Sequence, residues 1–456
     1  MKTRATRCVL QMIALLAALS CSPHALAQQT APPAVTLFEN VRIFDGRRAT
    51  LSAPTNVLIR GGLIERISNQ PIPTDRSGRT TLIDGGGRTL MPGLIDAHAH
   101  VSIYDLPNAV LMTADPNYQQ IRQAASAKHV LLAGFTSVRD MGGPVFGLKR
   151  AIDEGLVQGP RIWPSGAMIS QTSGHGEYRL LNQLPGAVMR EPPAGVRFGH
   201  QAMADGVPAV LTAVREQLMQ GATQIKLAVG GGVMSAYDPI DVTEYSLDEL
   251  KAAVGAAEDW GTYVAVHGYT VRSVRRAIEA GVKCIEHGQL LDEATLKLMA
   301  EKGIWLSTQP FLDDQDRIPM PVGSAGELRY KEVATGTDRA YTLAKKYRVK
   351  TAFGTDMLQN PNAVERIPFY LPKLTQWYTP AEVLKMATAD NAELLALAGS
   401  RNPYPGKLGV VEEGALADLL LVDGDPLSNI KLLEDPARNL LVIMKDGKIY
   451  KNTSRP

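Results

Sequence analysis

Short apolar runs alternate with amphipathic segments of helical period through the middle of the chain. The apolar runs predict eight strands, at residues 94–101, 136–141, 161–166, 224–229, 263–268, 284–288, 304–310 and 351–356. Apolar positions at helical spacing predict helices between most of them, at 118–133, 208–220, 247–260, 271–280, 292–301 and 338–347. Eight strand–helix units predict an α/β protein with a (β/α)₈ TIM barrel, whose last strand is covered by a helix at about 380–398.

The two ends of the chain have a different pattern. Residues 35–90 alternate apolar and polar positions and contain a Gly61-Gly62 hairpin signal. The C-terminal end has the same character, with two apolar runs that lead to a second hairpin signal at Asp446-Gly447. We therefore expect residues 28–90 and 402–456 to form one small β-sandwich domain beside a barrel of residues 91–401.

The N-terminus has the pattern of a signal peptide. Lys2, Arg4 and Arg7 precede an apolar run at 9–19, and a small-x-small cleavage pattern ends at Ala27. The run is too short to remain as a membrane anchor. We expect residues 1–27 to be removed and the protein to be exported to the periplasm or secreted.

The cysteines fit a cleaved signal peptide, but one of them leaves a lipoprotein anchor as an alternative. Cys21 is a possible lipoprotein attachment site, although Ala18-Leu19-Ser20 before it is a poor match. After cleavage only Cys284 remains, which excludes an intrachain disulfide. The stability of the mature chain must then come from its core and from any bound metal.

Composition narrows the class of protein. The chain has 456 residues, of which 45% are hydrophobic and 21% charged, as in an ordinary globular protein. Its net charge of +2 gives no reason to expect a nucleic acid or an acidic membrane surface as partner. A small molecule or a short peptide remains as the expected ligand.

Polar residues recur where the predicted strands end. Six of them are His98, His100, Lys226, His267, His287 and Asp356. A lone strand histidine is more often a hydrogen-bonded core residue than a metal ligand, and a lone buried lysine is costly. The C-terminal ends of parallel barrel strands converge on one place, however, and active sites of such barrels lie there. Together the six residues predict a metal site.

This pattern resembles the amidohydrolase superfamily over nearly the whole mature chain. Residues 92–100, Pro-Gly-Leu-Ile-Asp-Ala-His-Ala-His, are similar to the first-strand motif of that family, and residues 409–419 are similar to its C-terminal sandwich signature. The resemblance implies two divalent metal ions, most often Zn²⁺, about 3.5 Å apart. It assigns His98, His100 and Asp356 to the first metal, and His267 and His287 to the second.

The resemblance also implies a mechanism. Lys226 would be an N6-carboxylysine that bridges both metals; a carbamate suits this place because an ammonium group would be repelled by two dications. A hydroxide that bridges the metals would be the nucleophile, with the pKa of its parent water lowered to roughly 7. Asp356 would take a proton and pass it to the leaving amine.

Further motifs resemble one branch of the superfamily, the imidazolonepropionase-like proteins. This branch includes metal-dependent Xaa-Pro or Xaa-Arg dipeptidases and carboxypeptidases, and ochratoxin-hydrolysing amidohydrolases. His175 in Thr-Ser-Gly-His-Gly and Tyr269, two residues after His267, match positions that contact the scissile carbonyl or the substrate carboxylate. The resemblance therefore gives both residues catalytic and substrate-binding roles. Ser173 departs from the family's usual glycine. Loop packing for His175 and wall lining for Tyr269 are the plain alternatives.

Three connections, at 167–206, 230–245 and 311–328, are longer than a barrel needs. Each follows a predicted strand, so we expect substrate walls there, with decoration or oligomer contacts as the alternative. Arg179, Arg190 and Arg197 are candidate clamps for a carboxylate. His200 is a weaker candidate for substrate contact, and His129 is expected on a solvated or packed helix face. Loop position predicts an apolar wall that contains Val233, Met234, Phe311, Leu312 and Met357.

We expect an exported dinuclear amidohydrolase that cleaves N-acyl amino acids or dipeptides with a free C-terminal carboxylate. Ochratoxin A, an aromatic acyl group joined to phenylalanine, has this form. The alternative within the class is a cyclic-amide hydrolase of imidazolonepropionase type. The alternative from another class is a non-catalytic scaffold that has lost its metals. The resemblance also implies a homo-oligomer.

Overall fold

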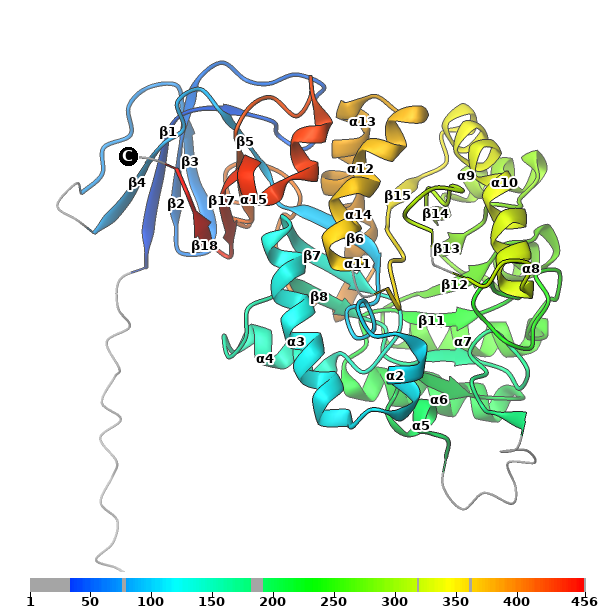
Figure 1. The fold of residues 1–456 in the computed structure, drawn as a ribbon. Coiled ribbons are helices and arrows are strands. Elements are labelled where there is room, and N and C mark those ends of the chain that lie inside the picture. The colour runs from blue at the N-terminus through cyan, green and yellow to red at the C-terminus, as the bar shows by residue number, and fades with distance from the viewer. Residues whose placement is uncertain (1–32, 76–78, 182–191, 318–319, 361–362, 455–456) are drawn as a thin grey trace, which may run out of the picture. The chain divides into compact units, whose positions relative to one another are not determined.

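The computed structural model describes residues 33–75, 79–181, 192–317, 320–360 and 363–454 (Figure 1). The predicted signal peptide, residues 1–27, and Arg190 lie outside these ranges. Contacts group Val35–Pro456 into one compact unit. Within the described ranges, no helix combines the length and the apolar character that a bilayer crossing requires.

All eight predicted strands are present, and they lie in two sheets whose neighbouring strands run parallel (Figure 1). The smaller sheet has the order β6-β7-β8, with β6 (Leu94–Ala99), β7 (Phe135–Asp140) and β8 (Arg161–Pro164). The larger sheet has the order β10-β9-β11-β12-β13-β14-β15, with β9 (Met168–Ser170), β10 (Gln201–Met203), β11 (Ile225–Ala228), β12 (Val264–Gly268), β13 (Cys284–His287), β14 (Trp305–Thr308) and β15 (Thr351–Phe353).

Hydrogen bonds join the two parallel sheets at both sides. The Asp356 amide donates to the His98 carbonyl at 2.8 Å, which ties the end of β15 to the end of β6. On the other side the Thr223 amide, just before β11, donates to the Pro164 carbonyl of β8 at 2.8 Å. The C-terminal ends of strands from both sheets are thereby held around one place.

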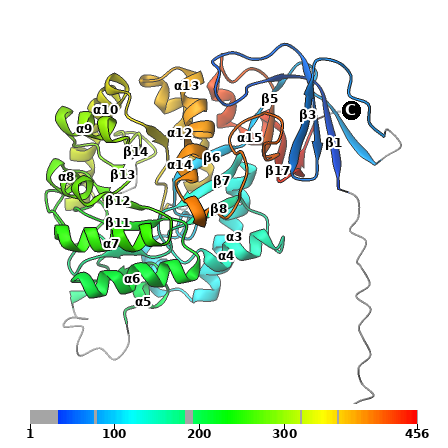
Figure 2. The same cartoon turned by 180° about the vertical axis from the view of Figure 1, so that it is seen from behind.

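Helices follow the strands and cover their outer side (Figures 1 and 2). They are α2 (Asn108–Thr113), α3 (Pro116–Leu132), α4 (Phe146–Asp153), α5 (Ala194–Arg197), α6 (Val207–Gln220), α7 (Leu247–Asp259), α8 (Val271–Ala280), α9 (Glu293–Lys302), α10 (Ala325–Tyr347), α11 (Ala363–Arg366) and α12 (Tyr370–Lys373). Local signals explain their starts. A capping box between Ser246 and Glu249 opens α7, and the side chain of Asp292 caps α9.

Two segments differ from the expected pattern. Helix α10 begins at Ala325 rather than 338, because Ser324 caps it and its first turns bury Tyr330 and Val333 over the pocket described below. The connection at 167–206 is not all loop, since β9 and β10 pair with each other and β9 pairs with β11. Residues 380–398 form α13 (Pro380–Lys385), a π-helical turn (Met386–Asp390) and α14 (Asn391–Ala396).

Strands from both ends of the chain share one sheet. Its order is β18-β17-β16-β5-β1-β2-β3, and β4 pairs with β1. The strands are β1 (Val35–Ile43), β2 (Thr55–Arg60), β3 (Leu63–Ser68), β4 (Thr80–Asp84), β5 (Thr89–Pro92), β16 (Leu419–Val422), β17 (Leu440–Lys445) and β18 (Lys448–Asn452), with α15 (Pro436–Asn439) before β17. Phe38, Ile59, Leu421 and Met444, from both ends, pack in one buried apolar cluster.

A buried ion pair joins this sheet to β8. The guanidinium of Arg161 donates to both carboxylate oxygens of Asp418, at 2.8 and 3.2 Å, and to Asp446 at 3.0 Å. The Arg161 and Asp418 side chains are 8% and 2% exposed. The contact therefore lies where water screens charges poorly.

We expect Asp418→Asn to lower the free energy of unfolding by about 3 kcal/mol, because it leaves the buried Arg161 guanidinium with only the exposed carboxylate of Asp446 as a counter-charge. Urea titration followed by tryptophan fluorescence measures the change. Asp45→Asn, at an exposed turn, is the control and should alter stability little. A loss below about 0.5 kcal/mol for Asp418→Asn would contradict the importance of this pair.

Candidate active site

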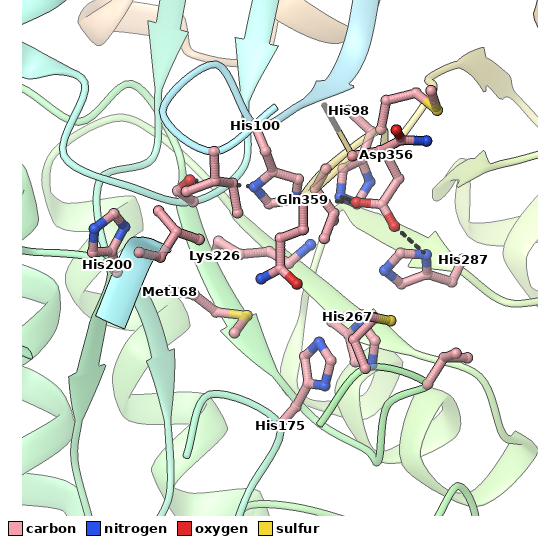
Figure 3. A pocket seen from close by; sticks show the side chains of 18 of the residues that line it. His98, His100, Met168, His175, His200, Lys226, His267, His287, Asp356 and Gln359 are labelled. Atoms are coloured by element: carbon pink, nitrogen blue, oxygen red, sulfur yellow. Dashed lines mark hydrogen bonds and ion pairs between the residues drawn. The ribbon is translucent and has the colours of Figure 1, made fainter. Parts of the chain in front are cut away.

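A cluster of possible metal ligands lies at the C-terminal ends of β6, β13 and β15 (Figure 3). One ligand atom from each of His98, His287 and Asp356 lies within 4.8 Å of the others. The Asp356 carboxylate is 3.3 Å from His98 Nε2, 3.1 Å from His100 Nε2 and 3.9 Å from His287 Nδ1. It is thus the common neighbour of three histidines.

The other predicted residues line the same pocket. The ring of His267 lies 4.5 Å from that of His287 between centroids, and the rings of His98 and His287 are 5.0 Å apart. The Lys226 side chain, only 2% exposed, comes from β11 and lines the pocket beside them. Its amine makes no hydrogen bond to another residue of the described ranges. The structure therefore brings all six residues together.

His98 lies in β6, and His100 lies in the turn that follows it. Each of these two histidines has its Nδ1 atom beside an oxygen atom of the protein. His98 Nδ1 lies 2.8 Å from Glu286 Oε2, and His100 Nδ1 lies 3.2 Å from the Gly142 carbonyl. An acceptor at Nδ1 favours the proton there and a lone pair at Nε2. At His100 the Nε2 atom also faces the Asp356 carboxylate at 3.1 Å, the group with which it would share a metal ion. His98 Nε2 is buried without a hydrogen-bond partner among the described residues.

The histidines of β12 and β13 follow the same rule. His267 Nε2 lies 3.1 Å from the Gly231 carbonyl, and His287 Nδ1 lies 2.8 Å from Gln309 Oε1. The other nitrogen of each ring keeps its lone pair. Four histidines with one anchored nitrogen and one available nitrogen fit metal ions, because metal-ligating histidines usually donate their second N–H to a protein oxygen.

Burial and neighbouring charges keep the site in the protonation state that metal ions need. Burial lowers the pKa of His98 to about 4 and holds the pKa values of His267 and His287 well below the ordinary histidine value. Burial also lowers the pKa of Lys226. Although burial alone would raise the pKa of Asp356, the neighbouring histidines hold it below its usual range. His98, His267 and His287 are therefore neutral and Asp356 is ionised, whereas at His100 burial is outweighed by the Asp356 carboxylate, which raises the pKa of this imidazole.

Two ligand candidates adopt left-handed backbone conformations. His287 has φ of 75° and Asp356 has φ of 50°, values that L-residues adopt rarely. Strand alternation would place Glu286 and His287 on opposite faces of β13. The turn at His287 instead lets both side chains approach His98. Such backbone strain at non-glycine positions is concentrated at functional sites.

His175 and Tyr269 lie against the metal-ligand candidates. The His175 ring stacks on His267 at 3.9 Å between centroids, with an angle of 9° between the planes. Tyr269 meets His267 edge-on at 5.0 Å and is 3% exposed. His175 Nδ1 is 3.2 Å from the Ser235 hydroxyl. Both predicted substrate-binding residues therefore face the same pocket.

We expect Gly232→Ala to displace His175. A Cβ atom at this glycine would lie 1.9 Å from His175 Nδ1, closer than any real contact. A shift of about 1 Å in a catalytic group lowers kcat/KM by up to about 100-fold. Steady-state kinetics measures the loss. Gly255→Ala, in α7 with nothing within 4 Å, is the matched control and should keep normal kinetics. Equal kinetics for both variants would argue against a role for the His175 ring.

A buried carboxyl group supports the His175 loop. Glu244 Oε1 accepts from the His175 amide at 2.9 Å. Burial, with a contribution from Asp238, raises the pKa of Glu244 from 4.5 to about 8. The folded state thus holds a proton that the unfolded state has released between these pH values. Stability from this proton is complete below pH 4.5 and is lost as the pH rises to about 8.

We expect Glu244→Gln, which imitates the protonated acid, to remove this fall in stability and to be more stable than the native chain at pH 9. Urea titrations from pH 5 to 9 test this. Glu258→Gln, at a half-exposed position on α7, serves as the control. Parallel pH curves for the native chain and Glu244→Gln would contradict the expectation.

The pocket wall is largely apolar. Four of the five predicted wall residues line it, namely Val233, Met234, Phe311 and Met357. Leu312 is not among the lining residues; its carbonyl accepts from the Tyr330 hydroxyl. His200 does line the pocket, whereas His129 lies exposed near the end of α3.

The structure also changes the set of candidate arginines. Arg179 forms an ion pair with Glu177, and Arg197 stacks on Phe198; neither lines the pocket. Arg317 and Gln359 do line it. Figure 3 shows Gln359 beside His100 and Lys226. Sequence reasoning missed both, since neither follows a motif. The position of Gln359, three residues after Asp356, is the one feature of the sequence that could have predicted its place at the site.

Fold and site together define a parallel α/β protein with a histidine-rich candidate metal centre at its strand ends. Residues 89–450 match the model of the amidohydrolase family, and the chain belongs to this family, which is metal-dependent. It is 34% identical to an ochratoxinase of Aspergillus niger over 378 residues, which cover 79% of this chain and 75% of that protein.

Solved structures of other proteins match the fold of this chain and support the family assignment. A prolidase complexed with N-methylphosphonate-L-proline matches with a TM-score of 0.83 and 34% identity, over 92% of this chain and 100% of that one. A Xaa-Pro dipeptidase with bound methionine matches with a TM-score of 0.78 and 28% identity, over 92% and 100% of the two chains. The protein is therefore a hydrolase that acts on amide bonds.

Proposed function

We propose that this protein is an exported dinuclear metallohydrolase that cleaves the amide bond of N-acyl amino acids or dipeptides with a free C-terminal carboxylate. One observation carries the proposal. Four histidines converge on Asp356 and Lys226, each with one ring nitrogen anchored to a protein oxygen. We also propose that the two parallel sheets are parts of one (β/α)₈ barrel, and that the sheet from both chain ends is a β-sandwich domain.

The residues suit two Zn²⁺ ions. His98, His100 and Asp356 would hold the first ion, His267 and His287 the second, and Lys226, as a carboxylysine, would contact both. When bound, the ions would activate water at neutral pH and polarise the scissile carbonyl. A buried lysine without a hydrogen-bond partner among the described residues is suited to carboxylation, because burial favours its neutral, nucleophilic amine.

The chain's own groups would then do the following. Asp356, held ionised by its histidine neighbours, accepts a proton and returns it to the leaving amine. Tyr269 and His175 donate hydrogen bonds to the developing oxyanion or to the substrate carboxylate. Burial raises the pKa of Tyr269, so its hydroxyl stays a donor at any physiological pH.

The pocket supports an apolar acyl group. Met168, Val233, Met234 and Phe311 line it, and Arg317 lies in the same wall as a cationic group. Among the relatives are an ochratoxinase and a prolidase, and the prolidase is complexed with N-methylphosphonate-L-proline, a ligand that contains an amino acid. Ochratoxin A, cleaved to ochratoxin α and phenylalanine, combines an apolar acyl group with a free carboxylate and is our proposed test substrate.

The test is a panel of N-acyl amino acids, dipeptides and ochratoxin A, with amino-acid release measured by chromatography. We expect turnover with zinc-loaded protein, and loss of turnover for the same substrates with amidated carboxyl ends. No release from any member of the panel would refute the proposed substrate class. Hydrolysis of cyclic amides only would favour the imidazolonepropionase type, and a metal content near zero would favour a scaffold.

Export and assembly have separate tests. N-terminal sequencing of the protein made in a cell with a secretion pathway should begin at Gln28. A protein that still begins at Met1 would contradict export through this segment. The homo-oligomer remains a proposal from the family resemblance, and light scattering measures its mass.

A further inference from the structure

A buried ion pair lies directly behind the metal-ligand candidates. Arg139 on β7 and Glu286 on β13 are both 0% exposed. Arg139 Nη2 donates to Glu286 Oε1 at 2.7 Å. The desolvation of two buried charges can cost more free energy than their attraction returns, so stability alone is weak grounds for this pair.

Hydrogen bonds from all three guanidinium nitrogens fix the Arg139 side chain. Its Nε donates to the Ala97 carbonyl at 2.6 Å, and its Nη1 donates to the Tyr263 hydroxyl at 3.2 Å. Ala97 is the residue before His98, and Tyr263 precedes β12. The guanidinium therefore connects β6, β7, β12 and β13, and it fixes the position of the Glu286 carboxylate relative to β6.

The second oxygen of Glu286 faces His98. Glu286 Oε2 lies 2.8 Å from His98 Nδ1 as a close charged contact outside hydrogen-bond alignment, and the Gln309 amide nitrogen lies 3.3 Å from the same atom. The Glu286 carboxylate can only accept from a protonated Nδ1, whereas the Gln309 amide N–H can only donate to an unprotonated Nδ1. The carboxylate is closer and charged, so it favours the proton at Nδ1, although the Gln309 amide has a second N–H besides the one it donates to the Ser307 carbonyl at 3.0 Å.

We propose that Glu286, fixed by Arg139, is a positioning residue that holds the His98 ring with its proton at Nδ1 and its lone pair at Nε2. The inference rests on the proposed function, in which His98 is a ligand of the first metal only. Glu286 would act chiefly on one of the two ions, since His98 is the described histidine that its carboxylate contacts directly, while its charge reaches His287 and Lys226 only through space. Partners of this kind alter metal affinity by about 10–100-fold.

Two variants separate positioning from simple folding. Glu286→Gln keeps an oxygen acceptor but removes its charge, and it leaves Arg139 uncompensated. The double variant Arg139→Met/Glu286→Met removes both charges and the acceptor together, a change that buried ion pairs often tolerate. Asp418→Asn is the matched control, because it breaks a buried arginine–carboxylate pair far along the chain from any metal-ligand candidate.

The measurement is Zn²⁺ binding to metal-free protein in competition with a chromophoric chelator, at fixed pH and with correct folding checked by circular dichroism. We expect native protein to bind two equivalents. In Glu286→Gln one equivalent should weaken by about 10-fold, and in the double variant by about 100-fold, while the second equivalent weakens clearly less. Asp418→Asn should lose stability but bind both equivalents normally. Absorption spectra with Co²⁺ should change for the weakened site alone.

The outcomes are distinguishable. Two equivalents of native affinity in the folded double variant would overturn the role of Glu286 and leave the proposed function intact. Equal weakening of both equivalents would overturn it as well, because the effect would not pass through His98. Failure of the native protein to bind Zn²⁺ would overturn the proposed function itself.

Discussion

Asp356→Asn should lower kcat by about 10²–10⁴-fold while the protein stays folded. The carboxylate is the common neighbour of His98, His100 and His287, and it is the ionised acceptor to which we assign the proton transfer. An amide of the same shape keeps the packing but accepts no proton. Single-turnover kinetics with saturating substrate measures the loss in the chemical step.

The controls for this variant are structural. Circular dichroism should match that of the native protein, and much of the zinc should remain in buffer with excess Zn²⁺, since one oxygen of the amide can still face the metal. Asp45→Asn, at an exposed turn, should keep full activity. Activity of Asp356→Asn within threefold of native would contradict the assigned role.

Lys226→Ala should lower activity by more than about 100-fold, since residues that only orient metal ligands already contribute 10–100-fold. The side chain is one of the largest with almost no exposure, so its removal leaves a cavity beside the ligands. A small carboxylate can enter that cavity and replace the carbamate. We therefore expect added acetate or propionate to restore part of the activity. Steady-state kinetics at increasing acid concentration measures the rescue.

Lys226→Arg is the matched control. It keeps a long cationic side chain but cannot form a carbamate, so it should be inactive and should not respond to carboxylates. Mass spectrometry under native conditions should find one added CO₂ per native chain and none in either variant. Full activity of Lys226→Arg would refute carboxylation as the reason for the lysine.

Sequence patterning predicted the eight parallel strands because buried strands are short, apolar and separated by helices, and this is a local signal. The sequence pattern predicted helix and strand boundaries less well where contacts between residues distant in sequence decide them. Helix α10 is longer than expected because Tyr330 and Val333 bury themselves against the pocket, and β9 and β10 exist because they pair with β11. None of these partners is near in sequence.

The sequence by itself determined which side chains supply the candidate metal centre. His98, His267 and His287 lie at or beside strand ends, His100 and Asp356 follow their strands, and Lys226 lies within β11. The C-terminal ends of parallel strands meet, so these side chains come together. Only the tertiary structure decided the orientation of each of these six side chains. The left-handed turns at His287 and Asp356, the stacking of His175 on His267 and the Glu286–His98 contact depend on residues from different strands. Orientation is set by packing and hydrogen bonds between distant segments, and a linear pattern carries no record of them.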